Sequence, residues 1–128
     1  MSVVRIADYL MCYRHQAKQL VTLISSAYTE EKPRQGLNEK RLMYFYIVNE
    51  TIFRSKEKGF EYIKAFGDQL NDWVDIFANS GCDEFALLDA LVKVIQIWED
   101  EFIFSKSFTD LLKSQLRTQL DMAMQKQY

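Results

Sequence analysis

The sequence predicts an all-α fold, and two features of the whole chain indicate it. Its 128 residues contain only one proline and four glycines, so few residues interrupt long regular elements. Apolar residues recur at spacings of three and four, which is the period of a helix, and strand-like alternation never continues beyond four residues. We therefore expect six or seven helices joined by short loops.

The first helical block is expected over residues 2–28, where Ser2 is a good N-cap residue. The apolar positions change phase at residues 14–16, so a break between two helices is expected there. The segment 29–37 holds the single proline and one of the glycines. It is expected to be a surface loop.

Two helices are expected in the middle of the chain. Asn38, followed by an acidic residue, favours a helix start, and the helix is expected over residues 38–58. Gly59 is then expected to be its left-handed C-cap. A further helix is expected over residues 61–77, ended by the polar residues and glycine at 79–81.

The last part of the chain predicts two more helices. Asp83 is expected to cap a helix over residues 84–100, and residues 102–104 are expected to form a short turn. Ser107, with Asp110 three residues later, is expected to start the last helix.

The composition is that of a soluble, intracellular globular domain. Hydrophobic residues make up 48% and charged residues 27%, and the net charge is −2 with both signs mixed along the chain. No Lys/Arg block of the kind that binds duplex DNA or an anionic membrane is present, so neither is an expected partner. The start of the chain lacks the pattern of a signal peptide, and no apolar run reaches membrane-spanning length. Cys12 and Cys82 are too few for a disulfide framework or a zinc site and are expected to be reduced.

The set of catalytic side chains is small, so we do not expect an enzyme. His15 is the only histidine, which excludes a metal site built on two histidines. Cys12 stands three residues before it, but no acidic orienting residue or oxyanion loop accompanies the pair. The glycines stand alone, without a phosphate-binding or dinucleotide-binding pattern. No catalytic residue, metal site or cofactor is predicted.

Three segments carry patterns more specific than helical periodicity: residues 2–24 (SVVRIADYLMCYRHQAKQLVTLI), 41–67 (RLMYFYIVNETIFRSKEKGFEYIKAFG) and 87–108 (LLDALVKVIQIWEDEFIFSKSF). They resemble, in this order, the patterns "SVxTLxxWxxxHRxxAxxIV", "LxYLxNDxxxxSKxKG" and "LxxIWxxRxVYxxxF" of the CTD-interacting domain family. The resemblance covers about residues 2–112. It implies a right-handed superhelix of about six to eight helices, similar to ENTH and VHS domains. Residues 113–128 are then a C-terminal helix extension of a single domain over residues 1–128.

The family binds the Tyr-Ser-Pro-Thr-Ser-Pro-Ser repeats of the RNA polymerase II tail. The resemblance therefore implies a nuclear peptide-binding module that acts in transcription, RNA 3′-end processing or termination. The peptide-binding residues that the resemblance implies come from two helices and are Tyr46, Asn49, Glu50, Phe53, Arg54, Lys93, Ile97 and Glu101.

The first five of these residues fall on one face of one helix, at i, i+3, i+4, i+7 and i+8. That face offers aromatic surface for prolines, an amide for peptide backbone and a carboxylate acceptor. In the family an aspartate at the position of Glu50 accepts a hydrogen bond from the peptide's tyrosine. Arg54 adds a positive charge that can reach a phosphate. Core packing of Tyr46 and plain snorkelling of Lys93 remain open alternatives.

Glu101 departs from the family pattern. Several relatives have an arginine there, which contacts the phosphate on the serine at the second heptad position. Glutamate at this position lacks the bidentate donor of arginine, and its negative charge repels the phosphate. One consequence is binding of unphosphorylated or otherwise phosphorylated tails, with Arg54, Lys56 or Lys93 meeting the phosphate. A second is binding of a more basic peptide through the acidic residues 99–101.

A third consequence is a protein–protein interaction scaffold of the same fold that has lost tail binding, and this is the main alternative function. An adaptor in membrane traffic would need a basic patch facing lipid, which the mixed charge does not favour.

Two further expectations concern the ends of the chain. Most family members have one more helix before the block that begins at Ser2, and whether a natural short form or a trimmed chain explains the difference is left open. Near the other end, Leu116, Leu120 and Met124 recur every four residues. We expect a monomer or a weak dimer through this last helix, because the run is too short to establish a coiled coil.

Overall fold

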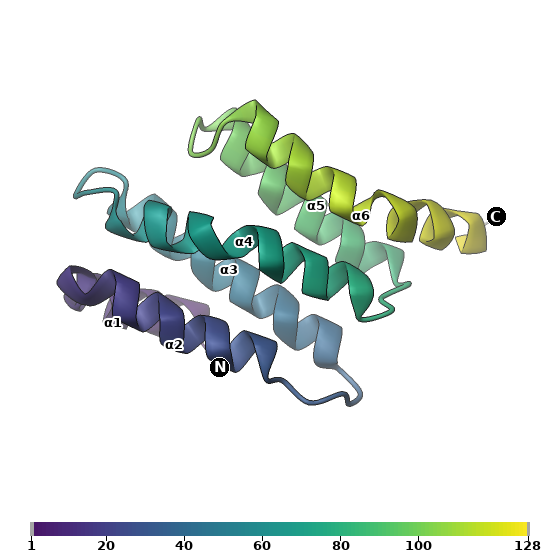
Figure 1. Ribbon diagram of the computed structural model, residues 1–128, viewed down its shortest axis with the longest axis horizontal. Helices are drawn as coiled ribbons and strands as arrows, with labels where there is room; N and C mark the ends of the chain where they lie inside the picture. Colours follow the sequence, from purple (N-terminus) through teal and green to yellow (C-terminus); the bar gives the residue numbers. More distant parts are fainter. Residues whose placement is uncertain (1, 128) are drawn as a thin grey trace. The chain divides into compact units, whose positions relative to one another are not determined.

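The computed structural model describes residues 2–127, which form six α-helices, a short 3₁₀ helix and no strand (Figure 1). The predicted all-α class is therefore confirmed, and the number of helices lies within the predicted range. In chain order the elements are α1 (Val3–Cys12), η1 (Arg14–Gln16), α2 (Ala17–Thr29), α3 (Leu37–Ser55), α4 (Glu61–Asn79), α5 (Phe85–Asp100) and α6 (Lys106–Gln127).

The chain divides into two compact units, one ending at Gln69 and the other beginning at Leu70, so that the boundary falls within α4. We call them unit 1 and unit 2 and describe each by itself. A single domain over residues 1–128, whose end residues Met1 and Tyr128 lie outside the described range, stays a prediction.

The N-terminal block of unit 1 follows the prediction. The hydroxyl of Ser2 accepts a hydrogen bond from the amide of Arg5 at 3.3 Å and so satisfies one of the unpaired amides of the first turn. The predicted break is confirmed, because η1 separates α1 from α2. α2 continues to Thr29, so the loop starts one residue later than expected.

The predicted start of α3 at Asn38 is wrong by one residue, and so is the predicted cap. α3 begins at Leu37, and Gly36 takes the cap position in the left-handed region, at φ 81°. The carbonyl of Gly36 accepts a hydrogen bond from the amide of Lys40 at 3.0 Å. Glycine adopts this conformation without the steric cost that a side chain brings, so a backbone conformation sets the start of the helix.

The predicted end of α3 is also wrong. The helix ends at Ser55 instead of Lys58, and Gly59, at φ 142°, is not its C-cap. The buried hydroxyl of Ser55 donates to the carbonyl of Ile52 at 3.2 Å, and the Ser55 carbonyl accepts from the amide of Lys58 at 2.8 Å. These local hydrogen bonds compete with continuation of the helical ladder and close a turn instead.

The core of unit 1 is built around Tyr28, which is fully buried. Its ring meets Tyr44 and Phe45 edge to face, with centroids 5.4 and 5.8 Å apart. The guanidinium of Arg41, also buried, lies 5.2 Å from the centre of the same ring. Edge-to-face aromatic pairs and a cation over an aromatic face are both favourable, so this cluster fixes the start of α3 against α2.

Three contacts join the helices of unit 1. α1 packs along α3. The hydroxyl of Tyr62, in the first part of α4, donates to the carbonyl of Leu10 on α1. Ser25 on α2 donates to the side chain of Gln69 at 2.7 Å. Because α1 packs along α3, charged residues on these two helices can meet.

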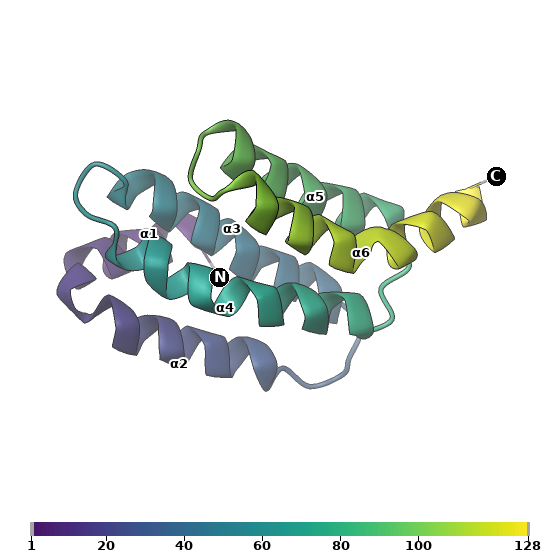
Figure 2. The ribbon, with the colours of Figure 1, turned by 45° about the horizontal axis from the view of Figure 1, so that its top comes forward.

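In unit 2, α5 and α6 run antiparallel, side by side (Figure 2). At the turn between them, the ring of Trp98 meets Phe104 edge to face at 5.7 Å, and Phe104 meets Phe108 at 5.2 Å. Both helices also bury aliphatic residues completely, which is the main stabilising contribution of such a pair. These residues are Leu88, Leu91, Ile95, Leu112 and Leu116.

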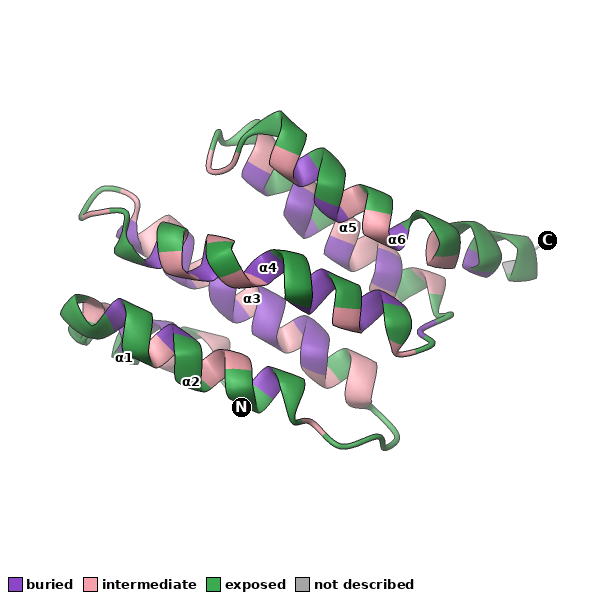
Figure 3. Ribbon diagram, in the orientation of Figure 1, coloured by how far each residue is buried: buried purple, intermediate pink, exposed green. Residues whose placement is uncertain are grey.

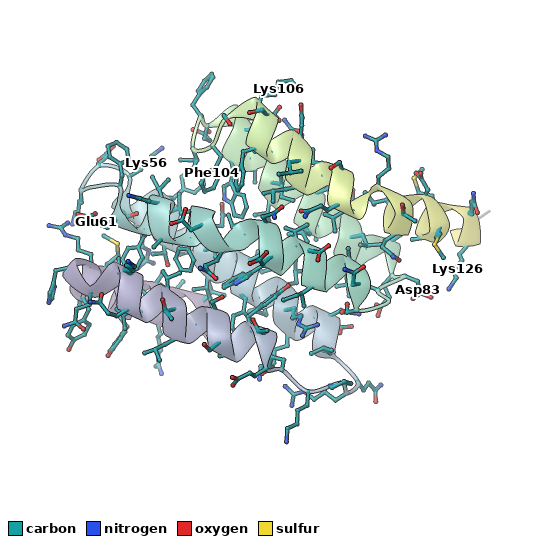
Figure 4. All side chains as sticks on the ribbon, viewed as in Figure 1. Lys56, Glu61, Asp83, Phe104, Lys106 and Lys126 are labelled. Atoms are coloured by element: carbon teal, nitrogen blue, oxygen red, sulfur yellow. The ribbon has the colours of Figure 1, made fainter. Side chains whose placement is uncertain are left out.

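The predicted Asp83 cap of α5 is wrong. The helix starts at Phe85, and Glu84 occupies the cap position without a side-chain hydrogen bond. Asp83 instead forms an ion pair with Lys126 near the end of α6, and the two side chains lie close together in Figure 4. The hydrogen bond from Lys126 lowers the pKa of Asp83. A partner 43 residues away thus engages the carboxylate that local rules assign to the cap.

The cap of α6 is Ser105, and the prediction of Ser107 is wrong. The hydroxyl of Ser105 accepts a hydrogen bond from the amide of Phe108 at 3.2 Å, which is the N-cap to N3 geometry. Asp110, predicted to complete a capping box, pairs with Lys106 at 2.9 Å. Ser107 lies inside the first turn of the helix.

The C-terminal part of α6 packs one of its sides against the rest of unit 2. Leu116 is fully buried within the chain and cannot contact a second molecule, whereas Leu120 is half-buried and Met124 is exposed. The amide of Gln115 donates to the side chain of Asn71 at 2.8 Å. A dimer seam that includes Leu116 is therefore incompatible with the fold, and dimerisation through the rest of the helix stays a prediction.

The turn between α5 and α6 carries backbone strain at Phe102. Within residues 2–127 it is the one non-glycine residue with a positive φ, at 57°, and its side chain is 92% exposed. A side chain in this region costs roughly 1–2 kcal/mol. An exposed ring offsets little of that cost by burial.

Phe102→Gly is expected to raise the free energy of unfolding by about 1 kcal/mol, because glycine removes the steric cost at this φ. Urea denaturation would measure the change. Phe60→Gly is the matched control, since Phe60 is also exposed, at 71%, but has no positive φ. It is expected to be neutral or destabilising, and equal effects of the two changes would show that no strain is released at Phe102.

Candidate functional site

Five of the predicted site residues form a half-buried stripe along α3. Nine of the 19 residues of this helix are buried, and it is drawn mostly in the buried and intermediate colours in Figure 3. The stripe follows the predicted spacing along one helical face. We call it the α3 stripe, and it consists of Tyr46, Asn49, Glu50, Phe53 and Arg54.

Tyr46 is neither a core residue nor a fully exposed one. Its neighbours Phe45 and Ile47 are buried, while Tyr46 is half-buried. Phe53, two turns later, has the same partial exposure, and so does Asn49 between them. The α3 stripe thus places a polar amide between two partly accessible aromatic rings. Such a surface can hold an extended ligand that has both apolar rings and hydrogen-bonding groups.

Arg54 lies between two carboxylates. Its Nε donates to Oε1 of Glu50, one turn earlier, at 3.0 Å, and its Nη1 forms an ion pair with Oδ1 of Asp8 on α1. The hydrogen bond to Glu50, together with Asp8, raises the pKa of Arg54, so the guanidinium keeps its charge. Asp8 was not among the predicted site residues. It stands 46 residues from Arg54, and no local pattern in the sequence signals the pair.

A second cation contact lies near the end of the α3 stripe. Nζ of Lys56 is 5.0 Å from the centre of the Phe53 ring, within the range of a cation–π interaction. Two of the three cations predicted to meet a phosphate, Arg54 and Lys56, therefore already have partners within unit 1.

The other three predicted site residues follow one exposed line of α5 in unit 2. Lys93, Ile97 and Glu101 stand at i, i+4 and i+8, and all three are exposed. Lys93 pairs with Asp89 at 2.8 Å, and this hydrogen bond raises the pKa of the lysine. The amide of Glu101 donates to the carbonyl of Ile97 at 2.9 Å and ends the helix. Lys93 is thus a surface lysine held by a carboxylate on its own helix.

The acidic residues at the end of α5 have different surroundings. Oε1 of Glu99 accepts hydrogen bonds from the buried hydroxyl of Thr109 at 2.6 Å and from Nζ of Lys113 at 3.2 Å. Its Oε2 accepts from the amide of Gln96 at 3.2 Å. The hydrogen bond from Thr109, with those from Gln96 and Lys113, lowers the pKa of Glu99 from 4.5 to about 2.

Glu99 therefore joins α5 to α6 and is a structural residue. Asp100 and Glu101 are exposed, so only these two acids of the run face solvent. Of the acidic residues 99–101 considered for a basic peptide, Glu99 is already engaged. The sequence gives no signal for this role, because two of its three partners come from the next helix.

Unit 1 also has a hollow between the start of α2 and the first half of α4. Charged residues of both signs line it, so it favours neither an anionic nor a cationic ligand. These residues are Arg14, Lys18, Glu61, Lys64 and Asp68.

The residues considered for catalysis lie on the surface. Cys12 and His15 are both exposed, and Nε2 of His15 lies 3.4 Å from the side-chain amide of Gln16. Within residues 2–127, no three His, Cys, Asp or Glu residues form a group that could hold a metal ion. Among the helices described, none combines the length and the hydropathy that a membrane span requires.

Comparisons with known proteins connect these features to a family. Residues 1–112 match the family model described as the CID domain. The chain is 27% identical over 117 residues to Regulation of nuclear pre-mRNA domain-containing protein 1A of Bos taurus and of Homo sapiens, covering 90% of this chain and 35% of each relative. It is 25% identical over 118 residues to Regulation of nuclear pre-mRNA domain-containing protein 1B of Mus musculus, covering 88% of this chain and 32% of the relative. The chain therefore spans about a third of the length of these relatives.

Glu99→Gln is expected to lower the melting temperature at neutral pH, because the amide loses the charge that Thr109 and Lys113 stabilise. Since folding lowers the pKa of Glu99, its contribution to stability is fully present above a pH of about 4.5 and is lost as the pH falls toward about 2. The difference in melting temperature between the variant and the native protein should therefore shrink as the pH falls through this window. Thermal melts followed by circular dichroism would measure it. The control Glu101→Gln, at an exposed position of the same helix end, should have a smaller effect. A difference in melting temperature that does not change with pH would contradict a stabilising role for the charge of Glu99.

Proposed function

This chain belongs to the CID domain family, and from that premise we propose that it binds the heptad-repeat tail of RNA polymerase II or a tail-like peptide. The resemblance inferred from its motifs is thereby confirmed. The family is one of binding modules and not of enzymes. The observation that carries the proposal is the α3 stripe, which lies within the matched residues and keeps its side chains partly accessible on a helix with nine buried residues.

The chemistry of the α3 stripe fits the repeat Tyr-Ser-Pro-Thr-Ser-Pro-Ser. The rings of Tyr46 and Phe53 are suited to proline rings, and the amide of Asn49 is suited to peptide backbone. Glu50 stands where the family has an aspartate that accepts a hydrogen bond from the peptide's tyrosine hydroxyl. A glutamate keeps the acceptor and extends it by one methylene.

On α5 in unit 2, the family resemblance assigns peptide contacts to Lys93, Ile97 and Glu101, and all three side chains are exposed. Glu101 replaces the arginine with which relatives hold the phosphate on the serine at the second heptad position. A carboxylate there repels a phosphate where the guanidinium would bind it with two hydrogen bonds. We therefore propose altered phosphate recognition, in which this mark does not strengthen binding.

The process in which the module acts is proposed from the relatives. Their name, Regulation of nuclear pre-mRNA domain-containing protein, supports a nuclear location and a role in pre-mRNA regulation. Within that role, the family resemblance favours transcription, RNA 3′-end processing or termination.

A second candidate function is an interaction scaffold of the same fold that no longer binds the tail. The exposed Glu101 favours it, because this residue replaces a phosphate-binding arginine with a carboxylate that repels phosphate. The two candidates differ in one measurable property, which is saturable binding of a tail peptide.

Phe53→Ala is expected to weaken binding of an unmodified two-heptad peptide roughly tenfold, because truncation of a contacting aromatic residue costs more than about 1 kcal/mol. Fluorescence anisotropy with a labelled peptide would measure the dissociation constant. Phe60→Ala is the matched control, since this phenylalanine is exposed and lies outside the α3 stripe, and it should leave the affinity unchanged. Saturable binding that neither change affects would place the peptide elsewhere, and no binding by the native chain would favour the scaffold.

Glu101→Arg is expected to raise the affinity for a peptide phosphorylated at the second heptad position roughly tenfold, because it restores a bidentate donor. The same titration with the unmodified peptide should show little change. Glu101→Gln separates the two contributions, since it removes the repulsion without adding the donor, and it should give a smaller gain. If Glu101→Arg does not change the preference between the phosphorylated and the unmodified peptide, residue 101 does not control phosphate recognition.

A further inference from the structure

The surroundings of Arg54 differ from those of an arginine that is available to a phosphate. Glu50 engages its Nε at 3.0 Å from within α3, and Asp8 engages its Nη1 from α1. One positive charge therefore lies against two negative charges, and the net charge of the group is −1. Both carboxylates come from elements that are packed together in unit 1.

This arrangement has a direct consequence for phosphate. Arginine binds phosphate best through two parallel N–H groups on one edge of its plane. Here Nε and one N–H of Nη1 already donate to carboxylates, so a phosphate is limited to the remaining N–H groups or must displace a carboxylate, and it would meet two negative charges as it approached. A neutral hydroxyl meets no such barrier, because it can donate to Glu50, whose side chain is 39% exposed.

Stability alone does not account for the Asp8 contact. The side chain of Asp8 is 63% exposed, and exposed ion pairs contribute little to folding because solvent screens them. Its carboxylate is a second acceptor for the Arg54 guanidinium, beside Glu50, from a position 46 residues away in the chain. Asp8 lies outside the α3 stripe, so it acts through Arg54 as a positioning residue.

We infer that Asp8 is a specificity determinant, which keeps Arg54 paired and thereby makes the α3 stripe discriminate against phosphorylated peptides in favour of unmodified ones. The inference rests on the proposed function for the identity of the peptide. The pairing of Arg54 itself can be tested without any peptide.

The peptide experiment uses Asp8→Asn, which keeps the size of the side chain and removes its charge. Two-heptad peptides, unmodified and phosphorylated singly at each serine position, are titrated by fluorescence anisotropy. The variant should bind at least one phosphopeptide roughly tenfold more tightly than the native chain, as expected for a gained charge-assisted contact. Its affinity for the unmodified peptide should stay within about twofold of native, since a tenfold change would need about 1.4 kcal/mol.

Two further variants distinguish an effect of the Arg54 pairing from an effect of the change in net charge. Asp110→Asn changes the net charge by the same amount, because it also removes one carboxylate, and it releases Lys106 from its ion pair. It should not change the preference between phosphorylated and unmodified peptides. Asp8→Asn combined with Arg54→Gln should abolish the gain. An equal gain with Asp110→Asn, or a gain that survives Arg54→Gln, would overturn the proposal. Thermal melts establish that each variant is folded.

A titration with O-phosphoserine, followed by the NMR signal of the Arg54 Nε–H group, tests the pairing directly. In the native chain the signal should hardly move, whereas in Asp8→Asn it should shift saturably. Equal shifts in both proteins, or none in the variant, would overturn the role of Asp8 whether or not the tail peptide binds. If the native chain binds no peptide but the phosphoserine titration gives the expected difference, the proposed function fails and the pairing stands.

Discussion

The burial of helix α3 is the constraint on which the rest of unit 1 depends. Nine of its 19 residues are buried, among them Phe45, Val48 and Ile52, so packing prescribes nearly half of its side chains. A helix covered in this way leaves only a narrow strip of accessible side chains. The residues on that strip are the ones that packing does not prescribe, and here they combine aromatic, amide and charged groups. This separation lets one helix serve the core and also carry the surface that we propose for ligand binding.

Internal pairing of charge is the second theme of the structure. Arg54 is held by two carboxylates, Lys93 by Asp89, and Lys56 lies over the ring of Phe53. Each of these cations could meet a phosphate, yet each already has a favourable contact that a ligand would have to replace. Together with the carboxylate of Glu101, these contacts support the proposed preference for ligands that bring hydroxyls and apolar rings over ligands that bring phosphate. The pattern arises separately in unit 1 and in unit 2.

The acidic end of α5 shows that neighbouring residues of one type can have different roles. Glu99 accepts three hydrogen bonds and joins two helices, and this explains why a carboxylate is kept where the helix dipole disfavours it. Asp100 and Glu101 face solvent. Surface chemistry at this end of the helix therefore depends on the last two acids, while the first contributes to stability.

The sequence by itself determined the all-α class, the break before α2, the family resemblance and the spacing of the α3 stripe. These features depend on periodicity and on motifs within single helices, which local residue order specifies. Only the tertiary structure decided the caps of α3, α5 and α6 and the partners of the charged residues. Asp83 shows the reason, because a lysine 43 residues away takes the carboxylate that local rules assign to a cap. Arg54 shows it again, since one of its two carboxylate partners is Asp8, which only folding brings near.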